Sequence, residues 1–161
     1  MQIDKKRLTK YLDEIVSETM DLEMLLARPD DEILPDQHLM KSLKYSTIVI
    51  AEAIAASLQH ILAKRHNAVV EGYMEVFKKT REFSILSDDL VSRLQPFLRF
   101  RNMLVHQYWR INDQTFLANL RDGLKDFREF GKDMKALLDD TGGDPAGVNQ
   151  GLKRRRHSDG P

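Results

Sequence analysis

The segment from Arg101 to Tyr108, with the sequence RNMLVHQY, carries polar side chains inside a pattern that predicts an amphipathic helix. A guanidinium taken out of water costs several kcal/mol unless it faces a partner, an anionic ligand or a subunit interface. His106 and Asn102 lie one turn apart on the flank of the apolar stripe of this helix. Together with Arg101 and Tyr108, they could border one cleft. At about 100° per residue, Arg101 and Tyr108 fall within that stripe, whose other members are Leu90, Leu94, Phe97, Leu98, Leu104 and Val105.

Arg101 and His106 together suit the binding of a phosphate and the transfer of a proton. The planar fork of a guanidinium matches a phosphate better than a lysine does. Imidazole has an unperturbed pKa of about 6.5, so it exchanges protons near neutral pH. The structural alternative is that Arg101 forms only an internal ion pair and His106 only a satisfied hydrogen bond.

The spacing Arg-x4-His-x-Tyr, with Asn102 directly after the arginine, resembles the signature of the HEPN superfamily, and the final Tyr108 points to its HepT-like toxin branch. The resemblance extends to the Ala-rich segment YSTIVIAEAIAASLQH at residues 45–60, which carries the single acid Glu52. It continues through the Gly72-Tyr73 pair and the segments that lead to the motif. In all it covers roughly residues 1–139, and the motif falls near the end of the fourth of five expected helices.

The resemblance to this branch implies a homodimer in which two motif helices meet in a shared cleft and cut RNA with its own 2′-hydroxyl. That reaction needs a base, positive charge on the phosphorane and an acid for the leaving 5′ oxygen. His106 would be the base or the acid, Arg101 would clamp the phosphate, and Asn102 would orient His106 or a phosphate oxygen. The resemblance implies neither a metal nor a cofactor.

Tyr108 gains a second role from the same resemblance. In HepT-like toxins the tyrosine two residues after the histidine is adenylylated by a cognate minimal nucleotidyltransferase antitoxin. AMP on Tyr108 would place phosphate charge and bulk in the cleft, where it competes with RNA. From the residues alone, the alternative is that Tyr108 closes the helix against the core with Trp109 alongside.

Other polar residues have weaker interpretations. Glu52 is expected either to neutralise Arg101 as a structural partner or to tune the charge of the cleft. The hydroxyls of Tyr45 and Tyr73 are expected at the polar tips of packing residues. No metal site is expected, because four further histidines combine with acids at no ligand spacing: His38, His60, His66 and His157.

Length and composition predict one cytoplasmic domain with no membrane segment. The chain has 161 residues, no cysteine, and 25 basic against 25 acidic residues, so any contact with RNA must be local. No apolar run approaches the roughly 20 residues of a membrane span, and the charged first seven residues are no signal peptide. Residues 140–161 are predicted to be a disordered basic tail that either adds affinity for RNA phosphates or only keeps the chain soluble.

Hydrophobic periodicity predicts an all-α, up-and-down bundle of four long helices and a short connector helix over residues 1–139. The helices are expected at about residues 4–27, 37–65, 73–83, 87–108 and 114–138, and residues 29–36 are expected to be a loop. The second helix is apolar on two sides and should be central. Ser87 with two following acids should cap the fourth helix, and Pro96 should bend it.

Three functions follow from these observations. The leading hypothesis is the toxin of a toxin–antitoxin pair, a metal-independent endoribonuclease silenced by adenylylation of Tyr108. The second keeps the fold without catalysis, as a binding module that docks a nucleotidyltransferase or a nucleotide, with Arg101 and Glu52 as an internal ion pair. The third is a purely structural helical dimer.

Overall fold

The computed structural model describes residues 2–140. The predicted basic tail, apart from Asp140, lies outside the described residues. The elements in chain order are α1 (Lys5–Leu25), α2 (Asp30–Ile33), α3 (Gln37–His66), α4 (Gly72–Glu82), α5 (Asp88–His106), η1 (Tyr108–Arg110) and α6 (Asp113–Asp140).

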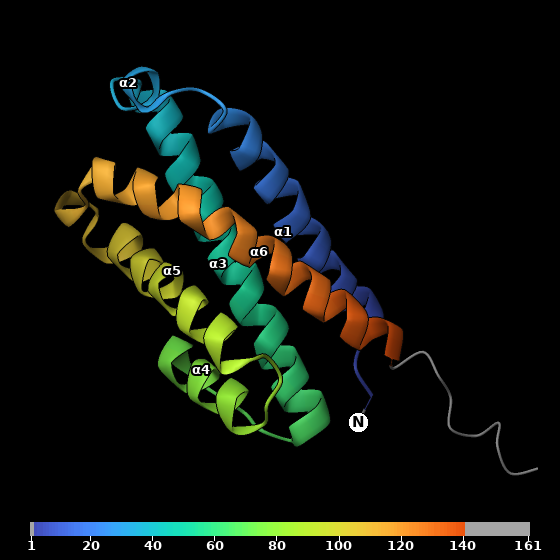
Figure 1. The fold of residues 1–161 in the computed structure, drawn as a ribbon. Coiled ribbons are helices and arrows are strands. Elements are labelled where there is room, and N and C mark those ends of the chain that lie inside the picture. The colour runs from blue at the N-terminus through green and yellow to red at the C-terminus, as the bar shows by residue number, and fades with distance from the viewer. Residues whose placement is uncertain (1, 141–161) are drawn as a thin grey trace, which may run out of the picture.

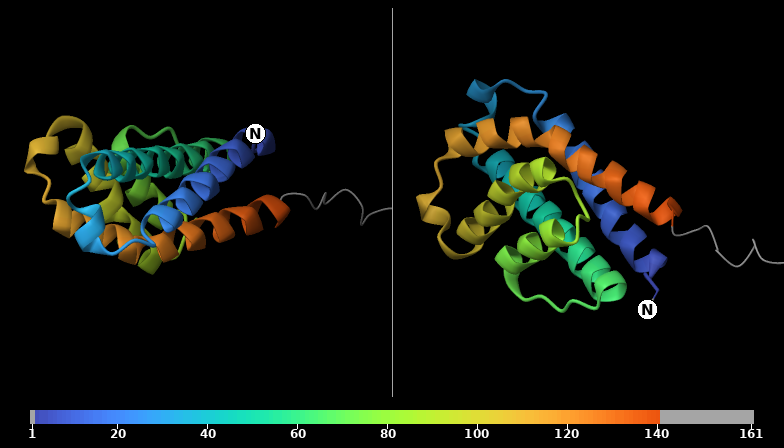
Figure 2. Two further views of the ribbon diagram at one scale, coloured as in Figure 1. Left: turned by 90° about the horizontal axis from the view of Figure 1, so that it is seen from above. Right: turned by 60° about the horizontal axis from the view of Figure 1, so that its bottom comes forward.

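Four long helices form a closed ring, which confirms the predicted all-helical bundle. Helix α1 packs on α3, α3 on α5, α5 on α6, and α6 returns to α1, while the short α4 covers α3 and α5 (Figure 1). The other two views show the same arrangement, with the turn between α5 and α6 projecting at one end of the bundle (Figure 2). Helix α3 is central as predicted, since half of its side chains are buried.

Two short elements differ from the prediction: α2 lies where a loop was expected, and η1 begins at Tyr108, which was expected to belong to the fourth helix. Pro29 caps α2 with a φ of −69°, and Asp30, Asp31 and Glu32 occupy its first turn. Proline at a helix start and acids near the positive end of the helix dipole both favour a helical turn, even in a short connection. The second element, η1, holds the last residue of the motif and is described with the site.

The expectation that no segment approaches a membrane span needs correction for α3. By length and composition this helix is long and apolar enough to cross a membrane, because alanines and serines separate its larger apolar residues without adding charge. Most of that apolar window is buried inside the bundle. Packing against α1, α4 and α5 therefore accounts for its hydrophobicity.

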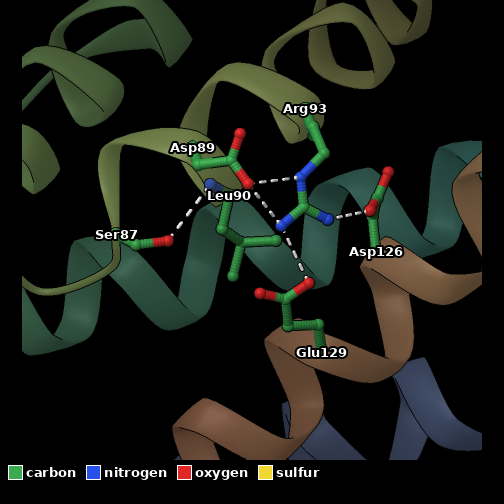
Figure 3. A network of polar contacts seen from close by, with 6 residues as sticks. All are labelled: Ser87, Asp89, Leu90, Arg93, Asp126 and Glu129. Atoms are coloured by element: carbon green, nitrogen blue, oxygen red, sulfur yellow. Dashed lines mark hydrogen bonds and ion pairs between the residues drawn. The ribbon is translucent and has the colours of Figure 1, made fainter.

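The motif helix α5 begins as predicted and is fixed to α6 by ion pairs. The Ser87 hydroxyl accepts a hydrogen bond from the Leu90 amide at 3.2 Å and caps the helix. One turn on, Arg93 pairs with Asp89 at 3.0 Å and reaches across to α6, where it pairs with Glu129 at 2.9 Å and with the buried Asp126 (Figure 3). A buried carboxylate needs such a counter-charge, so this contact sets how α5 lies on α6.

The start of the chain is joined to α3 through His60. Its Nε2 accepts a hydrogen bond from the backbone N–H of Asp4 at 3.0 Å, and Asp4 is the N-cap of α1. Burial lowers the pKa of His60, the positive charges of Arg7 and Lys64 lower it further, and Asp4 opposes them. A protonated imidazole has no free lone pair at Nε2, so protonation would break this bond.

We therefore expect the free energy of unfolding to fall as the pH drops from about 8 to about 5. The unfolded chain takes up a proton on His60 near the usual pKa of about 6.5, above the lowered folded value, so the stability is present above that pH and lost below it. Urea unfolding at a series of pH values measures this slope. A His60→Gln variant, which cannot titrate, should show a shallower slope, and an equal slope would contradict the prediction.

Candidate functional site

The motif spans the end of α5 and the turn that follows it. Helix α5 ends at His106, and Gln107, at φ −143° and ψ 41°, leaves helical backbone before Tyr108 enters η1. The prediction that Val105 and Tyr108 share the buried stripe is therefore wrong: they are 45% and 68% exposed, whereas Leu104 is buried. Tyr108 lies beyond the end of α5, where helical spacing no longer relates side chains, so the projection failed there. Val105 is still within α5, on its last turn.

Arg101 lies in a partly buried position on α5, facing α3 and α4. Its Nη2 forms an ion pair with Glu52 of α3, and its Nη1 donates a hydrogen bond to Asn102 at 3.1 Å. The guanidinium carbon lies 5.3 Å from the centre of the Tyr73 ring, within range of a cation–π interaction. The Nε–H is buried and has no partner among the described residues. The expected contact between Arg101 and Glu52 is thus present.

Tyr73, at the start of α4, completes this cluster. Its hydroxyl donates a hydrogen bond to Glu52 at 2.8 Å. Burial and the bond to the Glu52 carboxylate raise the pKa of Tyr73 to about 12, and Arg101 opposes the shift. The phenol therefore remains a protonated donor at any physiological pH and holds Glu52 beside Arg101.

His106 and Asn102 are both exposed on the outer side of α5. The amide oxygen of Asn102 is bound to Arg101 and not to His106. No hydrogen bond or ion pair within residues 2–140 engages the His106 imidazole, and the residue is exposed. A single chain therefore joins Arg101, Asn102, Glu52 and Tyr73 in one cluster and leaves His106 beside it.

Tyr108 and Trp109 project from η1. Their rings are 68% and 69% exposed and meet edge to face, with centroids 5.7 Å apart. The alternative in which Tyr108 closes the helix against the core with Trp109 alongside is therefore wrong. The phenolic hydroxyl of Tyr108 is accessible from solvent, as a modification site must be.

None of the five predicted site residues lines the cavity of about 450 Å³ between α5 and α6. That cavity is floored by Phe97, Phe100 and Phe116, and its polar residues include Arg93 and Asp126, which are already paired. The motif instead lies on an open surface. Among the described residues, no group of three His, Asp or Glu side chains is placed to hold a metal ion.

Sequence reasoning missed the surroundings of three aromatic side chains: Tyr73, Tyr45 and Trp109. Tyr73 was expected to be a packing residue with a polar tip, but its hydroxyl binds the acid that neutralises the motif arginine. Nothing in the local sequence signals this contact, because 21 residues separate Tyr73 from Glu52. Tyr45, expected to pack, is 65% exposed. The exposure of Trp109 follows from the end of the helix at Gln107-Tyr108. No residue type that usually ends a helix marks this position, so the sequence did not predict it.

Comparisons with known proteins agree with the fold. A family model described as Ribonuclease HepT-like matches residues 8–134. The chain is similar to the tri-AMPylated HEPN toxin of Shewanella oneidensis, solved in complex with its MNT antitoxin, with a TM-score of 0.75, 18% identity, and coverage of 84% of this chain and 99% of that one.

Two further solved structures have a similar fold. A mutant of the toxin–antitoxin pair MntA-HpeT matches with a TM-score of 0.72 and 17% identity, over 81% of this chain and 98% of that one. The cytosolic protein YutE of Bacillus subtilis, whose function is unknown, matches with a TM-score of 0.74 and 12% identity, over 86% and 92%. No curated protein matches the chain.

Proposed function

Because the chain belongs to the Ribonuclease HepT-like family, we propose that it is the toxin of a HEPN and minimal-nucleotidyltransferase pair, acting as a metal-independent endoribonuclease. The observation that carries the proposal is the state of the motif residues. Arg101 is preorganised by Glu52 and Asn102, while the His106 imidazole at the same end of α5 is exposed and unengaged. A phosphate clamp and a free acid–base group thus lie on one open surface.

In the proposed reaction the 2′-hydroxyl of RNA attacks the adjacent phosphorus and the 5′ oxygen of the next nucleotide leaves. The products are a 2′,3′-cyclic phosphate and a 5′-hydroxyl end. His106 removes the 2′ proton or supplies the proton of the leaving oxygen. Arg101 neutralises the charge that grows on the non-bridging oxygens, and Asn102 orients the guanidinium or a phosphate oxygen.

The site is proposed to be completed by a second copy of the chain. One protomer offers a single imidazole on an open surface, whereas the reaction uses both a base and an acid. Exposed apolar side chains flank the motif, with Met103 at 36% and Val105 at 45% exposure on the same helix. In a homodimer these side chains would be covered and the two His106 residues would face one cleft.

The proposed antitoxin acts on Tyr108. The similar Shewanella toxin is tri-AMPylated and was solved with an MNT antitoxin, and the Tyr108 hydroxyl here is accessible, two residues after His106. AMP groups attached there would add negative charge and bulk beside the phosphate-binding arginine and exclude RNA. RNA and a nucleotidyltransferase that uses ATP are cytoplasmic, so we place the protein there.

Cleavage of RNA by the purified full-length chain in EDTA tests the proposal. Mass spectrometry should first establish that Tyr108 carries no AMP. We expect cleavage to persist with the chelator and to leave 2′,3′-cyclic phosphate ends. Loss of cleavage in EDTA, or 3′-hydroxyl ends, would contradict a metal-independent attack by the 2′-hydroxyl.

The pairing of Arg101 with Glu52 favours one second candidate, a non-catalytic module that docks a nucleotidyltransferase or a nucleotide. In that function Arg101 has a structural role only: its ion pair with Glu52, which also accepts a hydrogen bond from Tyr73, joins α5 to α3. An unmodified protein that leaves varied RNAs intact but binds a nucleotidyltransferase would favour this candidate.

If the protein cleaves RNA, a Glu52→Gln variant tests whether Arg101 binds the phosphate or only pairs with Glu52. For the nuclease, Glu52 competes with phosphate for Arg101, so the variant should bind RNA more tightly and lower KM several-fold. The unfolding free energy should change by only about 1 kcal/mol or less, since the pair is partly exposed, with the Glu52 side chain 47% and the Arg101 side chain 22% accessible. An unchanged KM would argue for a purely structural pair. Glu23→Gln, which loses a comparable exposed pair with Arg128, is the matched control.

A further inference from the structure

We propose that Trp109 is a stacking platform for an unpaired base of the RNA beside the cleaved bond, so that the substrate is single-stranded RNA. This inference rests on the proposed nuclease function and deepens it by naming the substrate class. Three observations carry it: the exposure of the ring, the turn that holds it, and the charge around it.

Trp109 is the single tryptophan of the 161-residue chain, and its ring is 69% exposed. Tryptophan is highly buried on average, because its large ring stabilises a core when it is removed from water. Among residues 2–140, the one aromatic ring that pairs with it is that of Tyr108, edge to face, with an angle of 77° between the ring planes. Because most of the residue is exposed, the indole is accessible to a planar ligand.

The backbone of η1 holds this ring outward. The Arg110 amide donates to the Gln107 carbonyl at 2.9 Å, and the Ile111 amide donates to the Tyr108 carbonyl at 3.2 Å. These bonds fix the turn on both sides of Trp109, and η1 packs on α5. A ring on a fixed turn loses little conformational entropy when a base stacks on it.

The charge of this segment suits a phosphate backbone. Residues 90–112 contain four arginines and one histidine, and no Asp or Glu, in a chain whose net charge is zero. Arg93 and Arg101 are paired with carboxylates, but Arg99 and Arg110 are exposed and form no ion pair within residues 2–140. Asp113, the first acid after the segment, is neutralised by Lys44 at 2.7 Å.

A free cation beside an exposed aromatic face matches single-stranded RNA better than a duplex. An unpaired nucleotide offers a base face for the ring and a phosphate for Arg110, whereas the bases of a duplex are already stacked on one another. A protein partner would find no acid on this segment with which to pair its own basic side chains. The geometry therefore selects RNA with an unpaired base next to the scissile phosphate.

Intrinsic fluorescence tests this directly, because every tryptophan photon comes from Trp109. Full-length His106→Ala protein, which should bind RNA without cutting it, is titrated with a fluorescein-labelled single-stranded oligoribonucleotide and with the same strand in a duplex. Anisotropy of the label measures binding, and unlabelled RNA measures quenching of the tryptophan. We expect strong quenching by the single strand and little by the duplex.

Variants at position 109 separate stacking from general apolar contact. We expect Trp109→Leu to weaken single-strand binding about tenfold or more, and Trp109→Phe to retain most of it. Met24→Ala, which trims a 75% exposed apolar side chain on α1, should leave binding unchanged. Equal binding by the Leu and Phe variants would overturn the proposal.

The other outcomes are also decisive. RNA that binds by anisotropy without quenching Trp109 overturns the stacking proposal while the nuclease stands. If wild type cleaves RNA and Trp109→Leu cleaves it with the same KM, the stacking proposal again falls alone. A tryptophan emission that shifts to the blue as the protein concentration rises, and does not change when RNA is added, would assign the ring to a protein interface and overturn the stacking proposal. A wild type that neither binds nor cuts RNA overturns both proposals.

Discussion

Replacement of His106 by alanine should lower the rate of RNA cleavage by about 10²–10⁴-fold, the usual contribution of a general acid or base. The imidazole is exposed and engages no other residue among the described ones, so the variant should fold as the wild type does. The measurement is the initial rate on one labelled RNA in EDTA, beside an unfolding curve for each protein.

The matched control is His38→Ala, which removes another exposed histidine, in the first turn of α3. It should cleave at the wild-type rate. If His106→Ala retained full cleavage while Arg101→Ala lost it, the acid–base role would pass to another group. If both variants were as active as the wild type, the activity would belong to a contaminant or to another site.

A Tyr108→Phe variant should accept no AMP from the cognate nucleotidyltransferase with ATP, whereas the wild type should gain the mass of one or more AMP groups. The substitution removes only the hydroxyl that would attack the α-phosphate of ATP. Because Tyr108 is 68% exposed, loss of the hydroxyl should change the free energy of unfolding very little. Intact-mass spectrometry measures the modification, and the RNA cleavage assay measures what it does to activity.

Tyr45→Phe is the control, since Tyr45 is 65% exposed on α3 and lies outside the motif. It should be modified as the wild type is. We also expect Tyr108→Phe to remain active after treatment with the nucleotidyltransferase, while the wild type is silenced. If the Tyr108→Phe variant gained as much AMP as the wild type, the modified residue would be one other than Tyr108.

The long elements could be predicted because their signals are local and repeated. The central helix α3 was evident from apolar residues on two sides, and the start of α5 from Ser87 followed by two acids. The family motif located the candidate site, because its residues are close in sequence. The pairing of Glu52 with Arg101 could be proposed as one of two options, since a partly buried guanidinium needs a counter-charge.

The rest depended on tertiary geometry. The helix stop at Gln107 turned Tyr108 and Trp109 outward, and no glycine or proline marks it. The contact of Tyr73 with Glu52 joins α4 to α3 and requires the packing of both. The α2 turn formed where a loop was expected, because Pro29 at its start and three acids in its first turn favour a helical turn.

The closure of the ring by α1 and α6 has a consequence for synthesis. The first and last helices of the bundle pack on each other, and Arg121 of α6 donates hydrogen bonds to the carbonyls of Leu26 and Arg28 at the end of α1. A chain still emerging from the ribosome cannot cover the core faces of α1 and α5 until most of α6 has left the exit tunnel. Helix α5, which carries the motif, is translated before α6, on which it packs, so the growing chain should stay protease-sensitive until α6 has emerged.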